Sequence, residues 1–294
     1  MKLTLAHRRA LQGLMFITPW LMGFALFIAD PFIRSFQLTF HKVEMMDGFS
    51  LAWVGYANYV EAFTIDIDFV PQLLRVLRNM VVELPVIMVF ALVVAYLTNQ
   101  KIRGRTLFRA VFFLPVVIAS GLVIQQLNSQ GVGTIIDQSA TSGMTGIDLT
   151  DLLYQYLPEF MATSVAQVIN RLQLVLWRSG IQILLFLAGL QGISTTLYEA
   201  AKVDGATEWE LFWKVTLPNL SPVILVNAIY TVVDSFTDAL NPMLNLIRNR
   251  AFSGQFRLGY AAALGWVYFA VIFLIILLIW GTSKKWVFYG GERN

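Results

Sequence analysis

Five polar residues within one apolar segment are the first candidates for chemistry. They are, in chain order, Asn227, Thr231, Asp234, Asp238 and Asn241. Intervals of four, three, four and three residues place them on one face of a helix. Carboxylates, amides and a hydroxyl can exchange hydrogen bonds with the hydroxyl groups of a sugar, and Tyr230 at the edge of this face offers a ring for its CH groups. The spacing therefore predicts a polar path for a hydroxyl-rich solute.

The same residues also have a purely structural interpretation. Polar side chains inside membrane helices hydrogen-bond to neighbouring helices. For Asn227 and Thr231 this interpretation and solute contact stay equally open. For Asp234 and Asp238 a water-filled path is favoured, because a carboxylate that faces lipid costs about 2.5 to 3.5 kcal/mol on insertion scales.

Charged residues in other apolar segments are potential partners of these carboxylates. Arg171 and Arg178 are seven residues apart and share a helix face. We expect them to pair with Asp234 or Asp238 or to snorkel toward an interface, ahead of contact with an acidic substrate. Glu83, close to a proline, is interpreted as a helix-start or kink feature rather than a substrate ligand.

The elements that must position these residues follow from composition. The chain is 57% hydrophobic and only 13% charged, which is typical of an integral membrane protein. About 20 apolar residues cross a bilayer as a helix. We predict one all-α transmembrane domain over residues 1–294 with six spanning helices, at about residues 10–30, 79–100, 106–127, 168–192, 216–241 and 258–283.

The placement of lysine and arginine predicts which side of the membrane each loop faces. These residues gather before the first span, between the second and third spans, and after the sixth. Short loops rich in Lys and Arg stay in the cytoplasm, so both ends of the chain and the loop at 197–218 are predicted to be cytoplasmic. One loop disagrees, because Arg248, Arg250 and Arg257 lie between the fifth and sixth spans.

The loop at 197–218 has the pattern of a helix, a sharp turn and a second helix. Residues 197–202 are good helix formers, Gly205 permits a turn that a residue with a Cβ resists, and Thr207 offers an oxygen to cap the second helix. Charged and aromatic residues interleave over 208–215, so the second helix is amphipathic and needs an apolar partner surface. Ala200 and Ala201 have methyl side chains only, which suits docking into a cleft of a partner protein. The alternative, a helix pair lying on the lipid surface, is disfavoured because helix patterning alone would not produce the whole ordered pattern of residues.

The order of residues in this loop resembles the EAA loop of the membrane subunits of bacterial ABC importers. The family pattern is Glu-Ala-Ala, Asp-Gly-Ala three residues on, and an apolar ladder that closes with Leu-Pro. The matching residues, to which the resemblance assigns coupling with an ATPase, are Glu199, Ala200, Ala201, Asp204, Gly205, Ala206, Phe212, Leu217 and Pro218. Residues 16–19, 30–31, 108–115, 187–193 and 289–291 also resemble carbohydrate-uptake permeases, whereas residues 234–238 are more acidic than the family pattern.

The resemblance implies a fold and a set of partners. The fold is that of a type I ABC importer permease with a cytoplasmic coupling helix, in the bacterial cell membrane. The partners are a second permease subunit in a heterodimer, a dimer of ATP-binding cassette ATPases, and an extracellular solute-binding protein. The solute is expected to be a sugar, in particular an oligosaccharide, with another solute class as the alternative. ATP and Mg²⁺ are expected on the ATPase, and no cofactor is expected on this chain.

Other functions are disfavoured by what the sequence lacks. It has no cysteine and no G-x-x-x-x-G-K-[ST] phosphate loop, so the chain is not the ATPase. We predict no catalytic residue and no metal site, because no nucleophile, base or metal-ligand cluster has suitable spacing. The net charge of +3 is accounted for by cytoplasmic Lys and Arg, so nucleic acid need not be invoked. An ion-coupled secondary transporter is the less favoured alternative, since its usual paired repeats are not seen.

Overall fold

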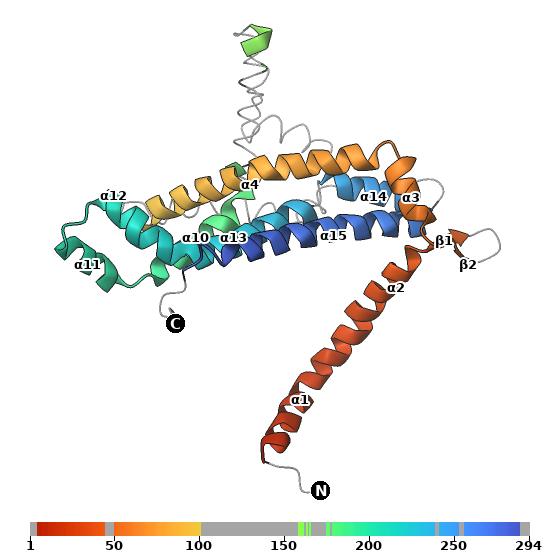
Figure 1. Cartoon of the computed structure of the whole chain (residues 1–294), viewed down its shortest axis with the longest axis horizontal. Coiled ribbons are helices and arrows are strands. Elements are labelled where there is room, and N and C mark those ends of the chain that lie inside the picture. The colour runs from red at the N-terminus through yellow and green to blue at the C-terminus, as the bar shows by residue number, and fades with distance from the viewer. Residues whose placement is uncertain are drawn as a thin grey trace, which may run out of the picture. The chain divides into compact units, whose positions relative to one another are not determined.

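In the residues that it describes, the computed structural model is helical apart from one short hairpin (Figure 1). The described residues are 5–44, 50–100, 158–161, 163, 165, 175, 176, 178–238, 241–252 and 256–288, with side chains described from Gln12 onward except for Glu44. They form two compact units. Unit 1 lies within Met1–Leu77 and Leu240–Phe273, and unit 2 lies within Arg78–Ala239 and Leu274–Asn294.

Several helical stretches are long and apolar enough to cross a membrane. They are Gln12–Leu38, Phe69–Asn99, Leu258–Ser283 and Glu208–Phe252, of which the last includes residues 239–240 outside the described part of the chain. A bent pair, Gly180–Gly192 and Thr195–Val203, meets at 63° and makes a fifth if it is one broken span. These stretches contain most of the predicted spans at 10–30, 79–100, 216–241 and 258–283 and the second half of 168–192.

The predicted membrane class is therefore confirmed, and the chain is a multi-pass helical membrane protein. The predicted span at 106–127 and much of the first half of 168–192 lie outside the described residues. The number of six spans accordingly stays a prediction.

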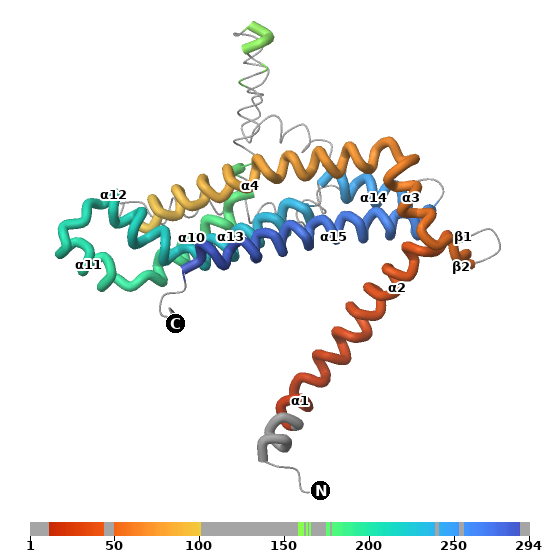
Figure 2. Tube along the Cα trace, viewed as in Figure 1, coloured from red at the N-terminus to blue at the C-terminus, as the bar shows by residue number. Residues whose placement is uncertain are grey.

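Unit 1 combines one hairpin with the helices next to it in the sequence and with two helical segments from later in the chain. Its elements are α1 (Leu5–Phe24), the π-helical segment η1 (Ala25–Ala29), α2 (Asp30–Leu38), β1 (His41–Glu44), β2 (Ser50–Trp53), α3 (Ala57–Thr64), α14 (Pro242–Phe252), the first turns of α4 (Phe69–Asn99) and the first part of α15 (Leu258–Ser283). Helices α1 and α2 run on through η1 without a gap (Figure 2). Trp266 of α15 packs against Phe32 and Phe36 of α2, with ring centroids 4.5 and 4.8 Å apart.

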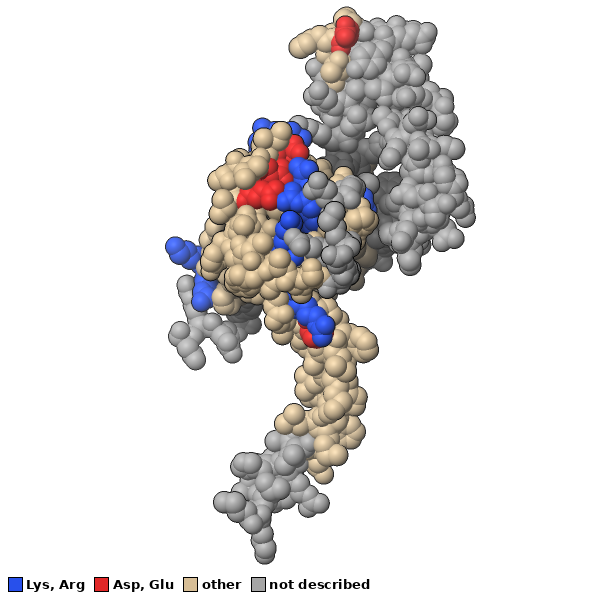
Figure 3. Space-filling model, turned by 90° about the vertical axis from the view of Figure 1, so that its right-hand side faces the viewer, with Lys and Arg blue, Asp and Glu red and all other residues tan. Residues whose placement is uncertain are grey.

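Two of the basic residues that disagree with the predicted orientation belong to an ion-pair cluster in unit 1. Arg250 of α14 lies 3.0 Å from Asp66 and 2.9 Å from Asp68, in the loop between α3 and α4, and Arg257 pairs with Glu61 of α3. Figure 3 shows acidic and basic side chains gathered next to one another on one face. These two arginines thus form ion pairs within unit 1, but the orientation rule counts Lys and Arg and gives Asp and Glu little weight, so the disagreement stays.

Asp66 is the centre of this cluster. Burial opposes its ionisation, but hydrogen bonds from the Tyr260 hydroxyl, the Asp68 backbone N–H and Arg250, together with the charge of Arg250, hold its pKa below the ordinary value. The carboxylate therefore stays ionised and joins α14 and α15 to the loop that precedes α4.

Unit 2 holds the loop and the polar helix that the sequence singled out. Its elements are the rest of α4, α10 (Gly180–Gly192), α11 (Thr195–Val203), α12 (Glu208–Glu210), the π-helical segment η2 (Leu211–Thr216), α13 (Leu217–Thr237) and the end of α15. Ala91 and Ala95 of α4, Phe186 of α10 and Leu220 of α13 belong to its buried core. Small residues let membrane helices approach closely, so dispersion contacts replace the hydrophobic effect as the source of packing energy.

Gly259 at the start of α15 marks the closest backbone approach in unit 1. A Cβ built on Gly259 would collide with the backbone carbonyl oxygen of His41 and lie 3.0 Å from that of Leu38. Neither obstacle is a flexible side chain, so the neighbouring backbone would have to move.

We therefore expect Gly259→Ala to destabilise the protein by about 1–3 kcal/mol or more, measured as a lower thermal midpoint of the detergent-solubilised protein. Gly265→Ala in the same helix is the matched control, because a Cβ there meets nothing within 4 Å. Equal thermal midpoints of the Gly259→Ala and Gly265→Ala proteins would contradict the close approach.

Candidate functional site

The turn between α11 and α12 is set by its own residues. Ser194 caps α11 by accepting a hydrogen bond from the Thr196 N–H, and the N–H groups of Gly205 and Ala206 bond back to the carbonyls of Lys202 and Ala201, each at 3.0 Å. Gly205 has φ of +81°, in the left-handed region that glycine enters without a steric penalty. The predicted sharp turn at Gly205 is thus confirmed.

The second helix begins with a complete capping box. Thr207 Oγ1 accepts from the Glu210 N–H, and the Glu210 carboxylate accepts from the Thr207 N–H at 3.1 Å. This satisfies two N–H groups that would otherwise lack partners at a helix start. The predicted cap at Thr207 is confirmed. Pro218 lies in the first turn of α13, and η2 joins α12 to α13 without a break.

The loop exposes one surface and buries another. Glu199 and Ala200 are exposed, and Val203 and Trp209 have exposed fractions of 88% and 70%. Phe212 packs edge-on against Tyr96 of α4 at 5.3 Å, which holds the amphipathic second helix to the body of unit 2. The predicted apolar partner surface of this helix therefore includes α4 of the same chain.

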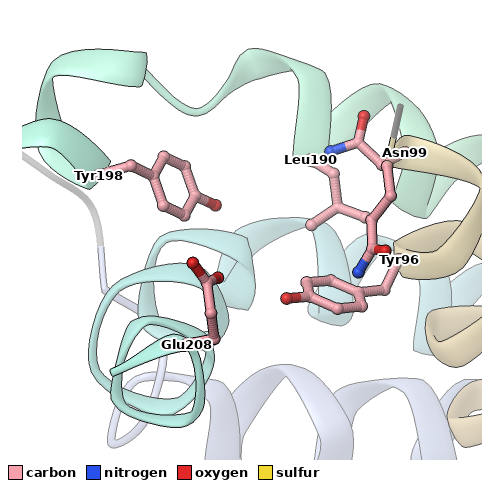
Figure 4. Close-up of a pocket in the computed structure, with 6 residues that line it drawn as sticks. Tyr96, Asn99, Leu190, Tyr198 and Glu208 are labelled. Atoms are coloured by element: carbon pink, nitrogen blue, oxygen red, sulfur yellow. The ribbon is translucent and has the colours of Figure 1, made fainter. Parts of the chain in front are cut away.

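A polar cavity lies between this loop and the ends of α4 and α10. Its volume is about 440 Å³, and its lining residues are Tyr96, Asn99, Gln100, Leu190, Tyr198 and Glu208. Figure 4 shows Tyr96, Tyr198 and Glu208 directing their polar ends toward the same space. The Tyr198 hydroxyl is also 3.0 Å from Thr216 Oγ1, so η2 contributes to positioning α11.

The inner part of the polar face of α13 is engaged in contacts between helices. Asn227 is fully buried and its Nδ2 donates to the Gln182 carbonyl of α10 at 3.0 Å. Thr231 Oγ1 donates to the Asn227 carbonyl at 2.8 Å. Asn227 thus serves as an interhelical hydrogen-bonding group, which is one of the two interpretations that the sequence left open. The Thr231 hydroxyl bonds back within α13 and lies 3.9 Å from Met88 Sδ of α4.

Buried amide groups nearby are incompletely satisfied. Gln182 has 1% of its surface exposed, and its Oε1 and Nε2, together with Asn227 Oδ1, have no hydrogen-bond partner in the described structure. Unsatisfied buried polar atoms cost about 1–3 kcal/mol each. They mark a position between α10 and α13 where a hydroxyl group or a water molecule would be stabilised.

Charged groups gather toward the other end of α13. Arg178, just before α10, lies 2.6 Å from Asp238 and 2.9 Å from Glu83 of α4. The exposed fractions of these three side chains are between 18% and 25%. The predicted pairing of Arg178 is therefore confirmed with Asp238. Glu83 lies inside α4 and forms an ion pair, so its interpretation as a helix-start feature is wrong.

The remaining predicted residues separate into two environments. Tyr230 and Asp234 are four residues apart on α13 and so are neighbours on one helix face. Helix α13 ends at Thr237, with Asp238 as its extended C-cap. Asn241 lies beyond the end of this helix, so its predicted place on the helical face is wrong; it lies in unit 1 and donates to the Tyr268 hydroxyl at 2.9 Å. Arg171 lies outside the described residues.

Removing the cation of this triad is expected to destabilise unit 2. Arg178→Leu leaves Glu83 and Asp238 facing each other without the shared arginine, and breaking a largely buried ion pair costs on the order of 3 kcal/mol. We expect a lower thermal midpoint, with partial recovery when Glu83→Gln and Asp238→Asn are added.

The control is Arg75→Leu, because Arg75 is exposed and bonds only to Gln72 among the described residues. Equal melting of the Arg178→Leu and Arg75→Leu proteins would contradict the structural role of the triad.

The part of the chain that contains the EAA-like loop and α13 matches a known protein family. Residues 171–283 match the family described as binding-protein-dependent transport system inner membrane component. The match begins in the part of the chain that leads into α10 and ends with α15. It therefore includes the EAA-like loop and the whole of α13.

Individual relatives extend the similarity over more of the chain. The probable ABC transporter permease protein YesP of Bacillus subtilis (strain 168) is 29% identical over 301 residues, covering 97% of this chain and 94% of YesP. The lactose transport system permease protein LacF of Rhizobium radiobacter is 30% identical over 224 residues, covering 76% of this chain and 72% of LacF.

A solved structure is similar in fold. It is the crystal structure of a bacterial alginate ABC transporter in complex with an alginate pentasaccharide-bound periplasmic protein. One of its chains aligns with a TM-score of 0.67 and 19% identity, covering 95% of this chain and 96% of that chain. At this identity the likeness concerns the fold alone.

Proposed function

The chain belongs to the family of binding-protein-dependent transport system inner membrane components, and we propose that it is a sugar-translocating permease subunit of an ATP-driven importer. The observation that carries this proposal is the capped helix–turn–helix from Glu199 to Pro218, which has the ordered EAA-like pattern. The names of the relatives supply the solute class, since LacF belongs to a lactose transport system.

The turn between α11 and α12 is the proposed docking element for the ATPase. Its exposed side includes Ala200 and Val203, whose short or apolar side chains allow close contact with a partner groove, and the charged Glu199 beside them. The turn is rigid because it is capped on both sides. Movement of the ATPase dimer would be passed through the unbroken α12–η2–α13 helix into the membrane.

The proposed orientation puts this loop and both ends of the chain in the cytoplasm. A second permease subunit, two ATPase subunits and an extracellular solute-binding protein complete the proposed importer. ATP and Mg²⁺ would bind the ATPase subunits, and this chain would act without a cofactor. Its own part is to bind, orient and release solute, with no covalent bond made or broken.

The proposed solute path follows α13. Tyr230 and Asp234 supply an aromatic ring and a carboxylate at the border of the Arg178 triad. The unsatisfied amide atoms of Gln182 and Asn227 supply further hydrogen-bonding capacity. Sugar hydroxyls need such donors and acceptors, and a glycan ring needs an apolar face, which supports an oligosaccharide as substrate.

Co-purification tests the proposal. We expect the tagged chain, extracted gently from membranes, to bring with it a second permease and an ATPase whose activity vanadate inhibits. A chain recovered alone and without ATPase activity would contradict the importer and favour an ion-coupled transporter.

Gly205→Val tests the docking role of the turn. A β-branched residue at φ of +81° is strained by about 1–2 kcal/mol, although no atom lies within 4 Å of the added Cβ. The turn is therefore expected to change shape while the spans still insert. We expect at least a tenfold loss of sugar uptake with normal membrane levels.

The matched control is Gly192→Val, because Gly192 ends α10 without a left-handed φ and also has open space around its Cβ position. Normal uptake by the Gly205→Val protein would refute the role assigned to this turn.

A further inference from the structure

The segment at the end of α15 combines exposed aromatic rings with lysines. Trp280 and Trp286 have exposed fractions of 53% and 44%, and Phe288 is 49% exposed. Lys284 Nζ lies 5.1 Å from the centroid of the Trp280 ring. Residues 274–288 contain two lysines and no acidic residue. We call residues 280–288, which are the last turn of α15 and the residues that follow it, the post-α15 segment.

The position of the post-α15 segment fits the boundary between hydrocarbon and headgroups. Leu274 and Leu278 on the preceding turns of α15 are 63% and 66% exposed, so an apolar surface leads up to Trp280. Tryptophan is enriched where the hydrocarbon ends, and lysines at the cytoplasmic surface attract anionic lipids. The aromatic rings can therefore pack against the acyl chain of a lipid while the two lysines contact the phosphate of the same lipid.

We propose that the post-α15 segment is a site for the headgroup of an anionic phospholipid. The proposal rests on the cytoplasmic orientation of the proposed function. Lys284 and Lys285 would contact the phosphate, while Trp280 and Trp286 would pack at the level of the glycerol backbone. A site of this kind is distinct from the polar face of α13 and from the turn at Gly205.

A hydrogen-bonded connection gives this site a means of influencing transport. The Phe288 N–H donates to Ser221 Oγ of α13 at 2.8 Å. Ser221 Oγ donates in turn to the Pro218 carbonyl at 2.6 Å, and Ser221 is only 3% exposed. Pro218 closes the EAA-like loop. Ordering of the post-α15 segment by lipid would therefore stabilise the junction between the loop and α13.

The test uses the complete importer in nanodiscs with defined fractions of phosphatidylglycerol in phosphatidylcholine. Native mass spectrometry measures retained phosphatidylglycerol, and ATPase activity is measured on the same samples. We expect Lys284→Gln with Lys285→Gln to lower phosphatidylglycerol retention about 30-fold, since each lysine near an anionic surface contributes about fivefold. The stimulation of ATPase activity by phosphatidylglycerol should fall in parallel.

Two further variants separate binding from its consequence. Arg34→Gln with Lys42→Gln removes two charges from exposed positions in unit 1 and should leave retention unchanged. Ser221→Ala should retain lipid as the wild type does, but its ATPase activity should respond less to phosphatidylglycerol. The exposed Phe288 can direct its N–H to water in this variant, so folding is preserved.

The outcomes distinguish this proposal from the proposed function. Unchanged lipid retention after Lys284→Gln with Lys285→Gln overturns the site. Loss of the ATPase subunit from that variant with unchanged lipid retention would also overturn it, by identifying a protein contact instead. Absence of binding-protein-stimulated ATPase activity in the wild type, in every lipid mixture, would instead contradict the importer itself.

Discussion

The exclusion of water from the membrane interior is the constraint on which this structure depends. Every buried polar group must find its partner within protein, because hydrocarbon offers none. The clearest example is Arg178, which forms ion pairs with both Glu83 and Asp238. These ion pairs connect α4 with the start of α10 and the end of α13. The same constraint explains why Asn227 reaches the Gln182 carbonyl of a neighbouring helix.

The EAA-like loop is organised by local rules instead. Ser194, Gly205 and Thr207 set its three boundaries through a cap, a left-handed turn and a capping box. Phe212 contacts Tyr96 of α4 in the body of unit 2, and the hydrogen bond between Tyr198 and Thr216 joins the two ends of the loop. A rigid turn with an exposed outer side is the form expected of an element that transmits force to a membrane helix.

The features that the sequence predicted are those with local causes. Gly205 and Thr207 specify their conformations by the chemistry of one residue, and apolar length specifies most spans that the structure describes. The Glu83–Arg178 pair was missed because its residues are 95 positions apart and no local pattern joins them. The end of α13 at Thr237 was missed because the polar spacing that leads from Asn227 to Asn241 fits a helix past the residue where the helix stops.

The unbroken helix from Glu208 to Thr237 has a mechanical consequence. At 1.5 Å per residue it is about 45 Å long, and its far end is held by the salt bridge between Asp238 and Arg178. It contains the π-helical segment η2 and Pro222, where helices bend, so a push at the other end changes its direction more readily than its length. Small displacements of the turn at Gly205 would therefore be converted into a change of angle within unit 2, with Arg178 as the fulcrum.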